Sequence, residues 1–189
     1  MTDRFQKVFV ESETALWNWL EANHQSAASY LLVTWKKTDP TRYLSRDQIL
    51  DGLLAYGWVD GRRYTLDDTK TMQLICKRQQ QKWTESYRKR IEKLQANGRM
   101  KQAGLEMISI AQANGTWLAD QDVDNLEIPS DLYTALHQKK GLDWWEASAP
   151  SYRRNILRWL KSAKKAETRQ KRCDIISDSS LAGQKIPNF

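Results

Sequence analysis

The residues best suited to bind a ligand lie between residues 58 and 83. They are two tryptophans, one acid and four cations: Trp58, Asp60, Arg62, Lys77, Arg78, Lys82 and Trp83. Trp58 and Asp60 alternate in sequence, so in an extended segment their side chains face the same side. An Asp beside arginines can orient a guanidinium through paired hydrogen bonds, and cationic groups bind anions. This pattern predicts a tryptophan-walled cleft for an anionic group.

The same stretch also has a structural interpretation that needs no ligand. Trp58 can be a core residue, and Asp60 can cap the next element. Gly57 and Gly61 can serve as turn residues. Glycine tolerates tight turns and tryptophan is strongly buried on average, so neither residue type requires a binding site. We favour this structural interpretation over the ligand cleft.

A second group of cations could bind a polyanion. These residues follow one another closely: Arg88, Lys89, Arg90 and Lys93. They could neutralise phosphates, while Trp83 and Tyr87 could stack on bases. No helix-turn-helix or RNA-recognition pattern accompanies them, and helical periodicity turns Tyr87 inward. A solvated helix face is therefore the favoured interpretation.

A third group of cations, Arg154, Lys164 and Arg169, lies near the C-terminus. Its role could be structural, since Glu167 can pair with Lys171 at i+4. Alternatively, these cations close over the N-terminal half as an interdomain or anion clamp. We prefer the clamp.

Enzyme chemistry has little support in the sequence. His24 and His137 are the only histidines, and neither has a partner at metal-ligand spacing. The HExxH, CxxC and Gly-x-Ser-x-Gly motifs are absent, as is the Gly-Lys-Ser/Thr phosphate loop. We predict no catalytic residue, no metal ligand and no cofactor, and expect a binding protein rather than an enzyme.

Hydrophobic periodicity predicts the elements that position these residues. In the N-terminal half we expect strands at 6–10, 29–37, 62–66 and 71–77, a short strand or turn at 58–60, and helices at 13–23 and 45–56. Ser45 and Gln48 form a capping-box pattern, and Gly57 is a natural helix stop. In the C-terminal half we expect helices at 84–96, 101–113, 130–137, 151–163 and 167–176, with a helical or irregular segment at 141–149.

The predicted fold class is α+β. A small N-terminal β-sheet with two helices, in the order β-α-β-α-β-β, precedes a C-terminal helical subdomain of four to five helices. The expected domains are an α+β subdomain at 1–83, a helical subdomain at 84–176 packed on it, and a flexible tail at 177–189.

Composition indicates a globular protein, with 40% hydrophobic and 28% charged residues in 189. Cys76 and Cys173 stand alone, which is typical of a reducing compartment. The N-terminus lacks the apolar run of a signal peptide, and no apolar stretch approaches the roughly 18 residues of a membrane span. We expect a cytoplasmic protein without a transmembrane segment, either a monomer or a homodimer.

Positive charge is concentrated in two segments. Residues 77–101 hold nine Lys and Arg against two Glu, and residues 153–172 hold nine against one. These segments together carry +15, so the remainder carries −8 of the net +7. We expect the two segments to converge in space as a basic face.

Two blocks of the sequence resemble the bacterial YdeI/OmpD-associated family, also called the bacteriocin-protection family. The first block comprises residues 56–61 (YGWVDG), Lys77-Arg78 and Trp83-Thr84. The second comprises Ser151, Arg153 or Arg154, Trp159, 163–165 (AKK), 167–169 (ETR) and Arg172, and 125–129 (NLEIP) is similar to the acidic lead-in of the family. The chain departs from the family pattern at Cys76, Gln79 and Tyr87.

This resemblance covers about Val8 to Arg172 and links the chain by name to protection against antimicrobial peptides. With the residues above, we expect a non-catalytic binding protein of envelope or antimicrobial-peptide stress, whose partner is an anionic small molecule or another protein. The alternative function is binding of nucleic acid or a phospholigand through the basic helices.

Overall fold

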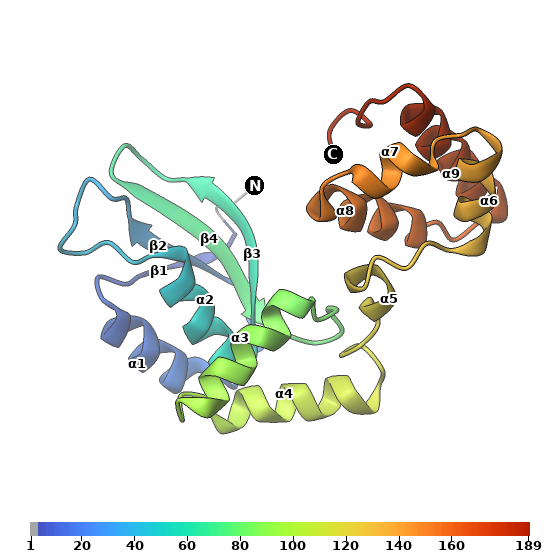
Figure 1. Ribbon diagram of the computed structural model, residues 1–189. Coiled ribbons are helices and arrows are strands. Elements are labelled where there is room, and N and C mark those ends of the chain that lie inside the picture. Colours follow the sequence, from blue (N-terminus) through green and yellow to red (C-terminus); the bar gives the residue numbers. More distant parts are fainter. Residues whose placement is uncertain (1–3) are drawn as a thin grey trace. The chain divides into compact units, whose positions relative to one another are not determined.

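The computed structural model of the protein describes residues 4–189 (Figure 1). Contacts divide the chain into two compact units, the first ending at Leu118 and the second running from Ala119 to Phe189. Each unit has hydrophobic clusters of its own. A separate core is the property expected of an independently folding domain.

The first unit contains a four-stranded sheet with the spatial order β1-β2-β4-β3. The strands are β1 (Gln6–Phe9), β2 (Tyr30–Trp35), β3 (Trp58–Thr65) and β4 (Lys70–Lys77). β1 is parallel to β2, and the other neighbouring pairs are antiparallel. A parallel pair needs a crossover connection, which is supplied here by a helix between β1 and β2.

Four helices accompany this sheet: α1 (Glu13–Asn23), α2 (Arg46–Ala55), α3 (Glu85–Ala96) and α4 (Gln102–Ala113). α1 and α2 pack on one face of the sheet through Leu16, Leu20, Leu32, Ile49, Leu53 and Ile75. The predicted capping box is confirmed, since Ser45 Oγ accepts from Gln48 N at 3.2 Å and Gln48 Oε1 accepts from Ser45 N at 2.9 Å. The box determines where α2 begins.

α3 and α4 belong to the first unit, so the boundary expected after residue 83 falls inside it. Their apolar residues cluster with Leu54 of α2 and with Trp83. Gly104 lets α4 approach α2 closely, because a Cβ there would lie 2.2 Å from the carbonyl oxygen of Ala55. The far side of α2 is thus apolar and is covered by these two helices.

The second unit consists of helices α5 (Gln121–Asp124), α6 (Ser130–Gln138), α7 (Leu142–Ala147), α8 (Pro150–Lys161) and α9 (Ala166–Leu181). α9 extends beyond the expected end at residue 176. Ile186 is only 8% exposed, and its backbone N–H donates to the Tyr152 hydroxyl at 3.2 Å. The segment expected to be a flexible tail is therefore anchored to the core of this unit.

The predicted α+β class and the order β-α-β-α-β-β are confirmed. Seven helices follow β4 in the described chain, of which five form the second unit. The prediction of four to five helices thus corresponds to the second unit alone.

In the described residues, no helix has both the length and the apolar character needed to cross a membrane.

Candidate anion-binding site

The two tryptophans of the predicted cleft lie in hydrophobic clusters. Trp58 is 1% exposed, and its ring centroid lies 5.5 Å from that of Trp19. Trp83 is also 1% exposed, and its ring centroid lies 5.2 Å from that of Trp117. Both rings pack against other aromatic rings, as the structural interpretation of this stretch expects.

Asp60, Arg78 and Trp83 of the predicted set lie close together, joined by Tyr87. The Tyr87 hydroxyl donates to Asp60 Oδ1 at 2.5 Å. The Arg78 guanidinium carbon lies 4.0 Å from the Trp83 ring centroid and 5.4 Å from that of Tyr87. Arg78 is 2% exposed and donates to two carbonyls of the loop after β4, at 3.3 and 3.4 Å. Burial lowers the pKa of Arg78. The cluster therefore connects β3, this loop and α3.

The other three residues of the predicted set are more exposed. The Arg62 guanidinium carbon lies 5.6 Å from the Tyr64 ring centroid on the surface. Lys77 is half-buried at the end of β4, and Lys82 is exposed in the loop that follows. The structure thus gathers Asp60, Arg78 and Trp83 but leaves these three cations at the periphery.

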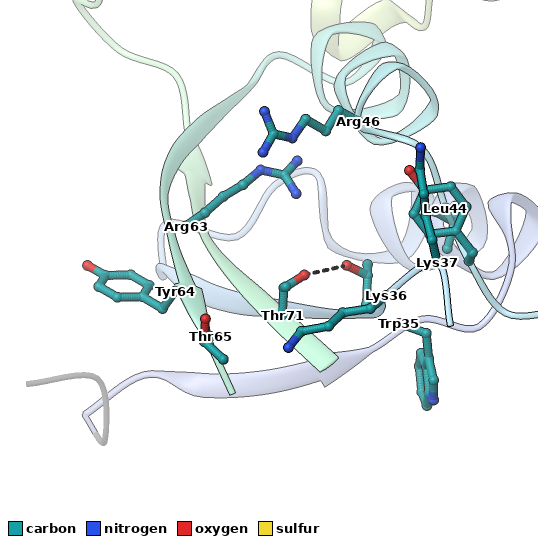
Figure 2. A pocket seen from close by; sticks show the side chains of 11 residues that line it. Trp35, Lys36, Lys37, Leu44, Arg46, Arg63, Tyr64, Thr65 and Thr71 are labelled. Atoms are coloured by element: carbon teal, nitrogen blue, oxygen red, sulfur yellow. Dashed lines mark hydrogen bonds between the residues drawn. The ribbon is translucent and has the colours of Figure 1, made fainter. Parts of the chain in front are cut away.

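A different set of cations lines a pocket of about 350 Å³ near the start of α2 (Figure 2). Four of the eleven lining residues are cations, namely Lys36, Lys37, Arg46 and Arg63, and none of the eleven is Asp or Glu. Figure 2 shows the side chains of Arg46 and Arg63 extending toward each other above Thr71. The hydroxyls of Thr71 and Thr34, on neighbouring strands, lie 3.4 Å apart at this pocket.

An irregularity in β3 determines which way Arg63 faces. Asp60 pairs with Ile75 and Arg63 pairs with Gln73, so three steps along β3 match two steps along β4. This bulge places Asp60 and Arg63 on the same face, although simple alternation would place them on opposite faces. Gly61 occupies the bulge, where a Cβ would lie 2.7 Å from the Leu74 carbonyl oxygen. That face is the one covered by α1 and α2, because Ile75 packs in their cluster.

Arg46 reaches the pocket from the opposite side, as the first residue of α2. The capping box at Ser45 holds this helix start in place. A cation in the first turn opposes the helix dipole, whose N-terminal end is positive. Arg46 therefore occupies an electrostatically unfavourable position, and this sequence signal could have marked it as a functional candidate.

The two guanidiniums act against each other. Burial, followed by the charge of Arg46, lowers the pKa of Arg63, and the charge of Asp60 opposes this shift only in part. Within residues 4–189, neither Arg46 nor Arg63 has a hydrogen bond or ion pair to a carboxylate. By contrast, the Lys36 ammonium donates to the Asp67 carbonyl at 2.9 Å. The arrangement is a concentration of positive charge that an anion would neutralise.

The cations of α3 mostly contact groups of the first unit. Arg90 pairs with Asp47 at 2.5 Å and with Asp51 at 2.7 Å. Lys89 pairs at 2.6 Å with the glutamate one turn earlier. Arg88 donates to two backbone carbonyls at 2.8 and 3.1 Å. These contacts neutralise or engage much of the charge that the sequence concentrates in this helix.

The cations of the predicted clamp have contacts within the second unit. Arg169 forms a two-pronged pair with Asp131, at 2.5 and 2.9 Å. Arg154 Nε donates to the Asp124 carbonyl at 3.3 Å, and Lys164 is exposed. The interdomain clamp stays a prediction, as does the convergence of the two cationic segments.

Sequence reasoning misses most of the pocket. In the sequence, Lys36 and Lys37 mark the end of a predicted strand, and Arg46 lies within the predicted capping box. Neither pattern identifies these residues as part of a binding site. Arg63 enters only as a neighbour of Asp60. Among residues 4–189, no three His, Cys, Asp or Glu side chains are grouped so that they could hold a metal ion.

Two family models match the chain, one in each unit. Residues 8–107 match a family described as a domain of unknown function (DUF8412). Residues 125–183 match a family described as bacteriocin-protection, YdeI or OmpD-associated. No curated protein and no solved structure is significantly similar.

The resemblance to the bacteriocin-protection family is confirmed for the C-terminal part of the chain. The block between residues 56 and 84, which also suggested it, lies within the DUF8412 match. The chain therefore belongs to the DUF8412 family, and its second unit carries a bacteriocin-protection, YdeI/OmpD-associated region.

Proposed function

We propose that the first unit is a non-catalytic binding domain for a small anion, which it holds between Arg46 and Arg63. One observation supports this proposal above all others. Two guanidiniums extend toward each other in a pocket whose lining includes four cations and no acid (Figure 2). Like charges in proximity raise the free energy of the ligand-free protein, and an anion between them removes that cost.

The chemistry of the lining suits a phosphate or carboxylate group. A guanidinium donates two parallel hydrogen bonds to either group, with fixed geometry. Thr34 and Thr71 add hydroxyls from the sheet, and Tyr43 adds an aromatic wall. The sequence offered an anion cleft lined by Trp and Arg as the less favoured alternative to a structural role, and the proposal keeps the anion but moves it to this pocket.

Thermal and chemical unfolding with added inorganic phosphate would test the proposal. A ligand that binds only the folded state stabilises it by about 2.7 kcal/mol at 100 times its Kd. We expect phosphate to raise the melting temperature of the wild type at constant ionic strength. Arg46→Gln and Arg63→Gln should each reduce that rise.

Arg62→Gln is the matched control, because it removes the same charge from an exposed neighbour of Arg63 that does not line the pocket. It should keep the full response to phosphate. If phosphate, sulfate and citrate all leave the wild type unchanged, or if Arg62→Gln loses as much as Arg63→Gln, the pocket is not an anion site.

A polyanion remains the competing ligand. The internal contacts of Arg88, Lys89 and Arg90 weigh against nucleic acid on α3. A gel shift with duplex DNA and single-stranded RNA over a range of salt concentrations would decide, because binding through phosphates weakens steeply with salt. If the Arg46→Gln and Arg63→Gln variants still bind DNA or RNA strongly, a polyanion is the better candidate for the ligand.

The family described by bacteriocin protection suggests the biological setting. We place the protein in the cytoplasm, which its two free thiols, Cys76 and Cys173, support. Bacteria that express the wild type should survive a bacteriocin challenge better than bacteria that express the Arg46→Gln, Arg63→Gln double variant. If both kinds of bacteria survive equally well, the arginine pocket is not needed for protection. Cell fractionation would test the location of the protein.

A further inference from the structure

A second pocket adjoins the arginine pocket and has a different polarity. Its volume is about 220 Å³, and Arg46 and Arg63 line both pockets. Beyond these arginines, the second pocket is lined by two apolar residues of α2 and by three residues with acceptor groups, namely Asp47, Asp60 and Gln73. The arginine pair thus stands between a lobe of cations and a lobe of acceptors.

Gln73 points to a ligand in the second lobe. It is 5% exposed, and its Nε2 donates to the Gly61 carbonyl at 3.1 Å. Its Oε1 is buried and lacks a hydrogen-bond partner in the described protein. Exchanging the amide oxygen and nitrogen would set two oxygens against each other at Gly61, so the orientation of the amide is determined. A buried acceptor without a donor costs free energy, and native proteins rarely tolerate one without a reason.

Asp60 supplies a second acceptor beside Gln73. The Tyr87 hydroxyl donates to Asp60 Oδ1 at 2.5 Å, which holds the carboxylate in one orientation. Burial, followed by the bond to Asp60, raises the pKa of Tyr87, so this hydroxyl stays a donor. A carboxylate has lone pairs for several donors, so Asp60 can still accept another hydrogen bond.

The spacing between the lobes is short. Arg63 and Gln73 are direct partners across the β3–β4 ladder. Side chains of paired residues stand beside each other on one face, with Cβ atoms about 5 Å apart. Both side chains line the second pocket, so a small molecule bound there would lie beside the guanidinium of Arg63 and the amide of Gln73.

We propose that the ligand of this domain is a small phosphate or carboxylate that also carries an amino or amide group, whose N–H donates to Gln73 Oε1 beside Asp60. The anionic end lies between Arg46 and Arg63, and the N–H end enters the adjoining pocket. This inference rests on the proposed anion-binding function and adds the class of ligand to it.

Isothermal titration calorimetry with two matched probes would test the inference. Phosphoethanolamine and n-propyl phosphate share the phosphate and the two-carbon linker, and they differ in an ammonium against a methyl group. We expect the wild type to bind phosphoethanolamine about tenfold more tightly, the ratio that one charge-assisted hydrogen bond provides. Gln73→Met removes the acceptor and keeps similar bulk, so it should lower the preference for phosphoethanolamine, and Asp60 should account for what remains.

Asp60→Asn provides an independent variant, because an Asn can still accept from Tyr87 while lacking the negative charge. It should also lower the preference for phosphoethanolamine, whereas Arg62→Gln should keep it. Equal affinity of the two probes for the wild type would overturn this inference and leave the anion site intact. If neither probe binds, the anion site itself is wrong, and the inference falls with it.

Discussion

At the scale of single residues, two groups of arginines differ in how their charge is engaged. Arg78, Arg90 and Arg169 are engaged by carbonyls, aromatic rings or carboxylates of the protein. Arg46 and Arg63 face each other, and in the part of the chain that the structure describes neither forms a hydrogen bond or ion pair with a carboxylate, although the charge of Asp60 attracts Arg63. Counting cations in the sequence does not distinguish these groups, because the distinction depends on which acids the fold brings near.

The first prediction concerns the stability of the ligand-free protein. Arg46→Gln removes both the repulsion with Arg63 and an unfavourable interaction with the dipole of α2, so it should stabilise the protein by about 0.5 kcal/mol at low salt. Urea unfolding would measure this gain. Arg62→Gln, on the exposed side, should change stability less, and saturating phosphate should reverse the order of the wild type and Arg46→Gln.

If Arg46→Gln destabilises the ligand-free protein, Arg46 has a favourable partner in solution. That result would contradict our expectation that repulsion between Arg46 and Arg63 destabilises the ligand-free protein.

The second prediction concerns acid, at the turn between β3 and β4. Hydrogen bonds from the Thr69 hydroxyl, from its N–H and from the N–H of Lys70 lower the pKa of Asp67 to about 2. A lowered pKa contributes stability above the ordinary value of 3.8, and that stability is lost as the pH falls toward 2. Asp67→Asn does not titrate, so its stability should fall less than that of the wild type between pH 5 and pH 2.

Urea midpoints of the two proteins at several pH values would measure the difference. If Asp67→Asn and the wild type lose stability in parallel, the turn does not hold Asp67 in its charged form.

At the scale of elements, the bulge in β3 determines the composition of the pocket. It places Asp60 and Arg63 on the face covered by α2 and leaves Arg62 on the surface. Without the extra residue of the bulge, alternation would turn either Asp60 or Arg63 away from α2. Gly61 makes the bulge possible because the Leu74 carbonyl lies against its Cα.

The third prediction follows from this close approach. Gly61→Ala would place a Cβ 2.7 Å from the Leu74 carbonyl oxygen, so the strands must shift. We expect a loss of stability of about 1–3 kcal/mol, together with loss of phosphate binding. Denaturant unfolding and calorimetry on the same variant would measure both effects.

Gly98→Ala is the matched control. Gly98 has a φ of 64°, but beyond its two chain neighbours a Cβ there would meet no described atom within 4 Å, so alanine strains only the backbone. That variant should lose about 1 kcal/mol and keep phosphate binding. If Gly61→Ala binds phosphate as tightly as the wild type, the bulge does not position Arg63.

At the scale of the whole molecule, the two family matches agree with the two units. Residues 8–107 lie within the first unit and residues 125–183 within the second. Each unit has its own hydrophobic clusters, and the arginine pocket is built entirely from the first. The chain therefore combines an anion-binding candidate with a region of a different family.

The fourth prediction follows from this division. A fragment of residues 1–118 should fold cooperatively and bind phosphate with a Kd within about twofold of the full chain, because separate cores usually fold independently. Circular dichroism and calorimetry would check the two properties. A folded fragment that has lost phosphate binding would show that the site requires the second unit.

Local sequence patterns were sufficient to predict the class of the fold and the order of its elements. Periodicity, the Ser45–Gln48 capping box and the helix-ending Gly57 are local signals, read within a few residues, and they correctly predicted β-α-β-α-β-β followed by helices. The family resemblance of the C-terminal part also came from local blocks of residues. Local interactions of this kind act before tertiary contacts form, so a sequence displays them directly.

Which charges remain available and where the units divide could not be predicted locally, because both depend on long-range contacts. Arg90 is neutralised by Asp47, 43 residues away, and Arg63 faces Arg46 only because a bulge shifts the register of β3. The C-terminal segment expected to be flexible is held by Ile186, and α3 joins the first unit because α2 has a second apolar side. Each of these outcomes depends on contacts between residues far apart in the chain, and the free energy of such contacts exists only once the chain has folded.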